Sequence, residues 1–361
     1  METIHVSLGD RGYPIILGEG AIGQLPAVLA ERIESQRIAL VTDSNVAPLY
    51  SGAVTELIEE AGGEPTLCVV PAGEEHKRLA AIDDLCGQFI EAGLDRGSLV
   101  IALGGGVLGD IAGFAAAAYM RGVPHIQIPT TLVAQVDSSV GGKTGVNHAL
   151  AKNIIGAFHQ PAAVIADTTF LKSLPPRELR AGLAEVIKHG IIADAGLFTY
   201  MEEEAERILE KDLDALLLPV RRSCEIKAQV VEADEREGGL RAILNYGHTF
   251  GHGIEAASNY TTFLHGEAVA LGMHAAGCLS WILGLVDDAF VDRQQKCLEA
   301  YGLPTQWPEI PVEEVLAAMK RDKKSRGGTL RFVVADRIGH VTQRTDVSEE
   351  QARRALTALA P

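Results

Sequence analysis

The sequence lacks the features that mark secreted and membrane proteins. No run of apolar residues approaches the roughly 18 that a membrane-spanning helix needs. The first residues do not form a basic segment followed by an apolar one, so we expect no secretory signal. The five cysteines are scattered and none forms a CxxC pair, which is typical of free, mostly buried thiols in a reducing compartment. These absences favour a cytoplasmic protein.

Positive charge is also scarce. The 32 Lys and Arg against 48 Asp and Glu leave a formal net charge of −16, which disfavours nucleic acid and anionic membrane surfaces as partners. Clusters of Lys and Arg in motif-like segments stand out against this background and indicate a small substrate with several negative charges. The chain has 361 residues, of which 47% are hydrophobic, so we expect a real core and two domains.

The first half alternates short apolar runs with helical patterns. Apolar runs at 4–8 and 13–17, separated by turn residues, predict a hairpin. Further patterns predict strands at 38–42, 66–70, 99–103, 125–128 and 164–166, with helices at 53–61 and 80–92. Strands that alternate with helices are typical of βαβ units and a mostly parallel sheet.

After Pro175 and Pro176 the pattern becomes mainly helical. Helices are predicted at 178–192, 197–209, 213–233, 266–283, 288–301 and 312–320, and one strand at 330–334. We find no internal repeat. The predicted fold is therefore an α/β domain with a mostly parallel sheet over residues 1–174, followed by a mainly α-helical domain over residues 175–361.

A glycine motif follows the predicted strand at 99–103. Gly104, Gly106 and Gly109 form a GxGxxG between a strand and a helix, where a helix N-terminus can present free N–H groups to a pyrophosphate. The acidic residue expected about 20 residues downstream is missing, and the best strand-end acid is Asp43, far upstream. The motif indicates either a nucleotide site of different internal arrangement or an accidental match.

Residues 129–156 form a long polar stretch. We predict a loop rich in Gly and Ser at 129–145. The whole stretch carries Asp137, Lys143, Asn147, Lys152 and Asn153. A solvated loop is the plain alternative, but long loops inside compact domains are uncommon and usually functional.

Three histidines mark the second half. His248 and His252 are four residues apart and share one face of a helix, and His265 follows from a separate helix start. Such a set can bind a divalent metal, and imidazole suits zinc. The alternative to a metal site is that these histidines lie on a helix face and form hydrogen bonds with the backbone.

Glu185 and Lys188 share a face of one predicted helix. A surface salt bridge would be unremarkable. The helix is otherwise small and apolar, however, so we expect this face to be buried, where a carboxylate must be paired or bind metal.

Together these segments resemble the 3-dehydroquinate synthase family of sugar-phosphate cyclases over nearly the whole chain. The segments that carry the resemblance are PAGEEHK, GGGVLGD, PTTLVAQVDSSVGGKTGVNH, KNIIGAFHQP, AEVIKHG, ADERE, LRAILNYGHTFGH, HGEAVALGM and DKKSRGG. Many long motifs in one order are far more specific than any single motif. The resemblance implies an NAD-binding first domain and a second domain that binds metal and substrate.

The resemblance implies one zinc or cobalt ion held by Glu185, His248 and His265, with His252 facing the substrate instead of binding the metal. It also implies an NAD site lined by Asp43, Asn45, Glu74, Lys77, Gly105, Gly106, Val107, Leu108, Gly109, Asp110, Thr130, Thr131, Lys143, Lys152, Phe170, Leu171, Lys172 and Ser173. Asp43 is expected on the adenosine ribose.

Substrate contacts are implied for a further set of residues: Asp137, Lys143, Asn153, Lys188, Lys227, Glu237, Arg241, Asn245, His252 and Lys324. In this family an arginine at the position of Arg121 reaches the neighbouring subunit's phosphate, so the resemblance also implies a homodimer.

The implied reaction converts 3-deoxy-D-arabino-heptulosonate 7-phosphate to 3-dehydroquinate and phosphate in the shikimate pathway. It proceeds through transient oxidation by NAD, β-elimination of phosphate, re-reduction and aldol closure. A sibling cyclase that makes a valiolone or an inosose is the nearest alternative, but the presence of both Arg241 and Lys227 for a carboxylate favours the first reading. The two remaining alternatives are a metal-dependent polyol dehydrogenase and a non-catalytic NAD-binding regulator.

Overall fold

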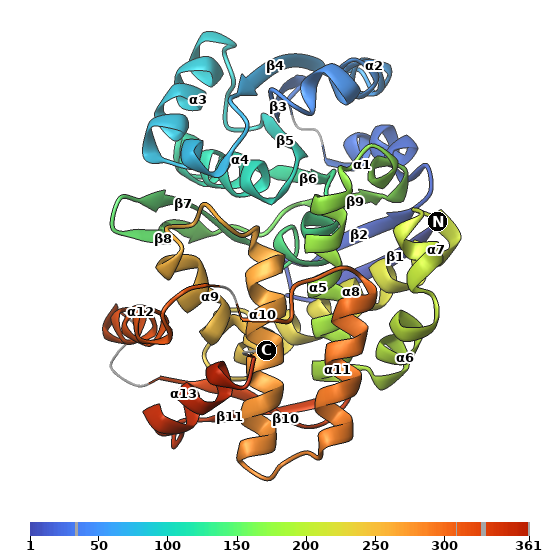
Figure 1. The fold of residues 1–361 in the computed structure, drawn as a ribbon. Coiled ribbons are helices and arrows are strands. Elements are labelled where there is room, and N and C mark those ends of the chain that lie inside the picture. Colours follow the sequence, from blue (N-terminus) through green and yellow to red (C-terminus); the bar gives the residue numbers. More distant parts are fainter. Residues whose placement is uncertain (33–34, 308, 326–329, 360–361) are drawn as a thin grey trace. The chain divides into compact units, whose positions relative to one another are not determined.

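The structure is a computed structural model that describes residues 1–32, 35–307, 309–325 and 330–359 (Figure 1). The chain divides into two compact units. The first contains Met1–Leu174 and Lys227–Arg236, and the second contains Pro175–Ile226 and Glu237–Pro361. Residues 227–236, which the sequence places in the helical domain, are thus packed with the first unit.

The first unit is built on a seven-stranded sheet in the order β1-β2-β9-β6-β5-β3-β4. Its strands are β1 (Glu2–Val6), β2 (Tyr13–Gly18), β3 (Arg37–Asp43), β4 (Glu64–Val70), β5 (Leu99–Gly104), β6 (His125–Pro129) and β9 (Ala163–Asp167). β1 and β2 form the predicted antiparallel hairpin, and the other pairs are parallel. The prediction of a mostly parallel sheet is confirmed.

Helices cover both faces of this sheet: α1 (Leu25–Arg32), α2 (Gly52–Glu60), α3 (Leu79–Glu91) and α4 (Gly106–Ala118). Successive side chains of a strand point to opposite faces. Accordingly, Val41 of β3 packs in the core beneath α3 and α4, and Leu40 packs in the core beneath α1 and α2. Figure 1 shows the two helix pairs on opposite sides of the strands.

The stretch predicted as a loop at 129–145 is more regular than expected. It contains a π-helical turn, η5 (Ala134–Ser138), and leads into an antiparallel pair, β7 (Lys143–His148) and β8 (Ala151–Phe158). The loop prediction is wrong from Lys143 onward, where β7 begins, because the glycines at 141, 142 and 145 obscure the strand alternation. Short helical turns complete the unit: η1 (Ala21–Gln24), η2 (Ala47–Ser51), η3 (Glu74–His76), η4 (Tyr119–Arg121) and η6 (Thr168–Lys172).

The second unit is mainly helical, as predicted. It contains α5 (Pro176–Ala193), α6 (Ala195–Glu203), α7 (Ala205–Leu209), most of α8 (Leu213–Ala233), η7 (Leu240–Asn245), α9 (His248–Ala257), α10 (His265–Ile282), α11 (Asp288–Ala300), α12 (Val312–Ser325) and α13 (Glu349–Thr357). The single helix predicted at 197–209 is wrong, because Glu204 leaves helical backbone geometry and separates α6 from α7. The predicted strand at 330–334 is β10 (Phe332–Arg337), which pairs with an unpredicted β11 (His340–Arg344).

Glycines allow three helices of this unit to approach closely. A Cβ on Gly266 of α10 would lie 1.9 Å from the backbone oxygen of Ala181 in α5. A Cβ on Gly272 of α10 would lie 2.1 Å from the backbone oxygen of Gly247, which precedes α9. Any side chain at these positions would force the backbones apart. The histidine stretch is therefore glycine-rich because α5, α9 and α10 touch through their backbones.

Two expectations about composition can be compared with the structure. All five cysteines are free and four of them are buried, as predicted. Within the described ranges, no helix has both the length and the apolar content needed to cross a membrane.

Candidate active site

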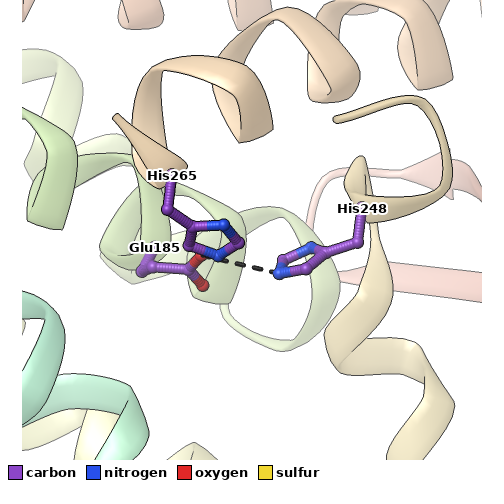
Figure 2. A group of neighbouring side chains, drawn as sticks. All are labelled: Glu185, His248 and His265. Atoms are coloured by element: carbon purple, nitrogen blue, oxygen red, sulfur yellow. Dashed lines mark ion pairs between the residues drawn. The ribbon is translucent and has the colours of Figure 1, made fainter. Parts of the chain in front are cut away.

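Three helices of the second unit bring Glu185, His248 and His265 together. Glu185 lies in the middle of α5, while His248 and His265 are the first residues of α9 and α10. Glu185 Oε1 is 3.6 Å from Nε2 of His248 and 3.5 Å from Nε2 of His265. Figure 2 shows the three side chains turned toward one another. One ligand atom of each lies within 4.8 Å of the others, so this set can hold a metal ion.

The chemistry of this set fits a divalent metal. Around tetrahedral zinc, ligand atoms about 2.0–2.1 Å from the ion are about 3.4 Å from one another, which is close to the separations found here. Glu185 is 1% exposed, and its Oε1 has no hydrogen-bond donor among the described residues. A buried carboxylate oxygen without a donor is costly, and a cation would satisfy it.

Lys188 compensates part of the charge on Glu185. The predicted burial of this face is confirmed, since both residues are 1% exposed, and Lys188 Nζ donates a short hydrogen bond to Glu185 Oε2. Burial by itself would raise the pKa of Glu185, but Lys188, His265 and His248 outweigh it and hold that pKa well below its usual range. The carboxylate is therefore ionised, as a metal ligand must be.

The two histidines differ in their electrostatics. Burial, followed by the charge of Lys188, lowers the pKa of His248 to about 3, so this imidazole is neutral and can donate its lone pair. Burial opposes a charge on His265, but the nearby carboxylates of Glu185 and Glu255 outweigh it and raise the pKa of His265 to about 10. In the metal-free protein His265 thus carries a proton that a metal would displace.

His252 lies beside this set and outside it. Its ring is 5.4 Å from that of His248 and 6.1 Å from that of His265, measured between centroids. It belongs instead to a second group with Glu255 and His265. His248, His252 and Glu255 are spaced at i, i+4 and i+7 on α9, so one helix face presents all three. This spacing is the signal by which Glu255, which the sequence analysis missed, could have been found.

Three further residues predicted to contact substrate in the second unit, Glu237, Arg241 and Asn245, lie in or just before η7. Arg241 is 2% exposed, and Asn245 Nδ2 donates a hydrogen bond of 3.1 Å to Glu237 Oε1. Glu237 has a positive φ of 60°. Lys324 belongs to α12, but its side chain lies outside the described residues.

In the first unit, the predicted nucleotide-binding residues gather at the carboxyl ends of parallel strands. Asp43 ends β3, and its Oδ1 accepts hydrogen bonds from the backbone N–H groups of Asn45 and Val46. Gly105 caps α4, whose first residues are Gly106, Val107, Leu108, Gly109 and Asp110. This edge is where α/β sheets bind nucleotides.

The glycines of the GxGxxG motif provide space without adopting left-handed backbone conformations. A Cβ on Gly106 would lie 2.7 Å from Ser138 Oγ, and one on Gly109 would lie 2.7 Å from Gln127 Oε1. Neither glycine has a positive φ. The motif therefore lets the start of α4 pack closely against η5 and β6.

A hydrogen-bonded network links several predicted cofactor and substrate residues. Lys77, 4% exposed, donates to Asp110 Oδ2 at 2.6 Å and to Asn153 Oδ1 at 2.5 Å. Asn147 accepts from the Asn153 backbone N–H at 2.8 Å and donates to Glu74 Oε1 at 2.7 Å. Burial raises the pKa of Asp110 despite the nearby Lys77. Asn147 thus connects the turn at Glu74 to β8.

Asp137 and Lys227 form a short ion pair in the same unit. Lys227 comes from the last part of α8 and is the first residue of the segment 227–236 that groups with the α/β unit. Lys143 and Asn153 are exposed on β7 and β8, and Lys152 is half-buried on β8. Arg121 is exposed at the end of η4, with a positive φ of 70°.

The remaining predicted NAD contacts fall into two groups. Thr130 and Thr131 follow β6, and Thr131 Oγ1 accepts a hydrogen bond of 3.2 Å from the Ala134 backbone N–H. Phe170 and Leu171 are buried, and Tyr50 packs on Phe170 with a centroid distance of 4.6 Å. Lys172 is exposed, and Ser173 Oγ is hydrogen-bonded to the Tyr50 hydroxyl. Contacts from Phe170 and Leu171 to a cofactor would use backbone atoms.

The sequence matches two family models that together span residues 67–325 and so include parts of both units. Residues 67–181 match a model described as 3-dehydroquinate synthase N-terminal, and residues 182–325 match one described as 3-dehydroquinate synthase C-terminal. A 3-dehydroquinate synthase of Acidithiobacillus ferrooxidans is 51% identical over 360 residues, which is 99% of this chain and 98% of the relative.

Solved structures of two further enzymes share the fold. A 2-epi-5-epi-valiolone synthase from Streptomyces hygroscopicus with NAD+ and Zn2+ bound has a TM-score of 0.89 and 31% identity, covering 96% of each chain. A 2-deoxy-scyllo-inosose synthase complexed with carbaglucose-6-phosphate, NAD+ and Co2+ also has a TM-score of 0.89, with 26% identity, and the match covers 98% of this chain and 99% of that chain.

Proposed function

This chain belongs to the 3-dehydroquinate synthase family, and on that premise we propose how its residues serve the reaction. The protein is an enzyme, a phosphate-eliminating lyase of the shikimate pathway. It converts 3-deoxy-D-arabino-heptulosonate 7-phosphate to 3-dehydroquinate and phosphate. The structural observation that carries this conclusion is the set formed by Glu185, His248 and His265, in which a buried carboxylate oxygen lacks a donor among the described residues.

The enzyme uses NAD and one divalent metal ion, zinc or cobalt. When bound, the metal supplies a Lewis acid for substrate hydroxyls, and NAD supplies a reversible hydride acceptor. Glu185, His248 and His265 hold the metal. Lys188 keeps Glu185 ionised before the metal arrives, because its ammonium group pairs with the buried carboxylate.

The NAD contacts are assigned to the carboxyl edge of the sheet. Two backbone N–H groups donate to Asp43 Oδ1 and fix the orientation of this carboxylate, which would bind a ribose hydroxyl of NAD. The start of α4 offers its N–H groups to the pyrophosphate, supported by the glycines that let it pack closely. Lys77 and Glu74 are held in place by Asp110 and Asn147.

The substrate's two anionic ends require different partners. Arg241 and Lys227 suit the carboxylate, since a guanidinium group binds it through two parallel hydrogen bonds. Lys143, Asn153, His252 and Lys324 suit the phosphate. We assign no side chain as the base of the elimination step, because the substrate phosphate can accept that proton itself.

Two alternative activities are less well supported. A sibling cyclase would retain the NAD and metal residues, but the 51% identity to a 3-dehydroquinate synthase exceeds the 31% identity to the valiolone synthase. A polyol dehydrogenase would release NADH and would not need as many cationic groups around its substrate.

We propose that the protein is a homodimer that works in the cytoplasm. Arg121 lies exposed at the end of η4, consistent with a role in a neighbouring subunit's phosphate site, and on this basis we propose a homodimer. Free cysteines are typical of a reducing compartment, and they favour a cytoplasmic location.

Phosphate release and NADH absorbance, followed together, test this proposal. With heptulosonate phosphate and NAD we expect phosphate release without net NADH, lost on chelation of the metal and restored by zinc or cobalt. Steady NADH production from a simple polyol without phosphate release would instead establish a dehydrogenase. If heptulosonate phosphate releases no phosphate but another phosphorylated sugar does, the protein is a sibling cyclase.

A further inference from the structure

His265 lies between two carboxylates that approach its two ring nitrogens. Nε2 is 3.5 Å from Glu185 Oε1, and Nδ1 is 3.6 Å from Glu255 Oε2. Glu185 belongs to the proposed metal set, whereas Glu255 is on the other side of the ring. The side chain of His265 is 40% exposed, so packing alone does not fix the orientation of its ring.

Glu255 is buried more deeply than an ordinary surface carboxylate. It is 3% exposed and lies on α9, seven residues after His248. A buried carboxylate is costly unless it is paired, and the Nδ1 group of His265 is an ion-pair partner within reach.

We propose that Glu255 is a positioning residue for the metal centre, accepting the Nδ1–H of His265 so that Nε2 points toward the metal. This inference rests on the proposed metal site. A histidine that ligates a metal commonly donates its other ring N–H to a carboxylate, which fixes the tautomer and the ring orientation and makes the ligating nitrogen more basic. α9 thereby contributes one ligand through His248 and supports a second through Glu255.

Metal affinity provides a readout that is independent of turnover. The full-length protein is stripped of metal with a chelator and titrated with zinc against a competing chelator. We expect Glu255→Gln to weaken zinc binding about 10-fold and Glu255→Ala up to about 100-fold. The glutamine can still accept a hydrogen bond but carries no charge, so its effect is expected to be smaller. Unchanged zinc affinity in both folded variants overturns the inference.

Two further variants separate this inference from the metal site itself. Glu202→Gln removes a carboxylate paired with Arg293 elsewhere in the same unit, and its zinc affinity should equal that of the wild type. His265→Ala should lose zinc. If His265→Ala keeps zinc, the metal site is wrong; if it loses zinc while both Glu255 variants bind normally, only the role of Glu255 is wrong.

A measurement on the wild-type protein covers the case in which the Glu255 variants fail to fold. In zinc-loaded protein labelled with 15N-histidine, the nitrogen shifts of His265 report which ring nitrogen binds metal and which carries hydrogen. We expect metal on Nε2 and hydrogen on Nδ1. Metal on Nδ1, or an Nδ1 without hydrogen, overturns the inference.

Discussion

Three lysines among the residues proposed for the sites are buried and paired with carboxylates, and one of them, Lys227, pairs with Asp137. Lys188 pairs with Glu185 beside the histidines, and Lys77 pairs with Asp110 at the start of α4. Each pair places a charge where an apolar side chain would be more stable. Lys188 helps to hold the pKa of Glu185 low, whereas burial raises the pKa of Asp110 despite the nearby Lys77.

Replacement of Lys188 should separate metal binding from turnover. In Lys188→Ala we expect metal to be retained, because the three ligands remain, and turnover to fall at least about 100-fold, as when an active-site proton-transfer group is lost. Metal content by atomic emission and phosphate release measure the two effects. Lys320→Ala removes an exposed lysine paired with Glu349 and serves as the control. Normal turnover in Lys188→Ala would remove Lys188 from the catalytic residues.

His125 should make the stability of the protein depend on pH. It is 1% exposed at the start of β6, and burial, with the nearby His159, lowers its pKa to about 3. As pH falls below the unfolded value of about 6.5, the unfolded chain gains a proton that the folded protein does not. The resulting loss in free energy of unfolding is about 2 kcal/mol between pH 7.5 and pH 5.

Urea unfolding at the two pH values measures this loss. His125→Phe keeps a ring but cannot titrate, so the difference in stability between pH 7.5 and 5 should shrink by about 2 kcal/mol. The matched variant His5→Phe, at an exposed position of β1, should leave the difference unchanged. An equal difference in His125→Phe and the wild type would contradict the prediction.

At the scale of elements, the metal set depends on how closely three helices approach. Glu185 is in the interior of α5, and the two histidines are at the first positions of α9 and α10. The side chains meet because Gly266 and Gly272 let the backbones touch. A displacement of about 1 Å would already change the ligand geometry by more than a functional site tolerates.

Gly266→Ala should therefore impair the site through the backbone. Its Cβ would lie 1.9 Å from the Ala181 oxygen, so α10 must move away from α5 and carry His265 from Glu185. We expect weaker zinc binding and a loss of stability of about 1–3 kcal/mol. Gly87→Ala, in α3 with nothing within 4 Å of the new Cβ, should be neutral or slightly stabilising. Normal zinc affinity in Gly266→Ala would refute this account.

At the scale of the whole molecule, the chain contains two units with different chemistry. The α/β unit has the predicted NAD residues, and the helical unit has the predicted metal ligands. The segment 227–236 joins the α/β unit from within the helical half of the sequence, and it brings Lys227 to Asp137. Each proposed site therefore takes residues from distant parts of the sequence, which only the folded chain assembles.

The proposed homodimer can be tested by subunit complementation. If Arg121 serves the neighbouring subunit, a dimer of one Arg121→Ala chain and one His265→Ala chain contains one complete site. Each variant alone should be nearly inactive, and an equal mixture formed by co-expression should recover about a quarter of the wild-type activity. Phosphate release measures the recovery.

The control pairs Lys188→Ala with His265→Ala. Both residues are expected to serve their own subunit, so a mixed dimer has no complete site and should stay inactive. Full activity of Arg121→Ala alone, or no recovery in the mixture with His265→Ala, would contradict a role for Arg121 across the dimer.

The sequence by itself determined the fold class, most strands and helices of both halves, and the candidates for the site. Apolar runs and helical spacing report on local burial, so β1 to β6 and α5 could be predicted from them. Glu185 and Lys188 could be placed on one buried face because i and i+3 meet on any helix. Glycine-rich composition concealed β7 and β8, which are strands through their mutual pairing and, for β7, its packing against α4.

Only the tertiary structure decided which residues meet. The i, i+4 spacing of His248 and His252 suggests a ligand pair, yet the third member of the set is Glu185, more than 60 residues earlier. Glu255 acquires a role because α10 brings His265 back against α9, and Asn147 because β7 packs beside the turn at Glu74. Spacing along one helix describes a single face, whereas a metal site forms from faces that packing brings together.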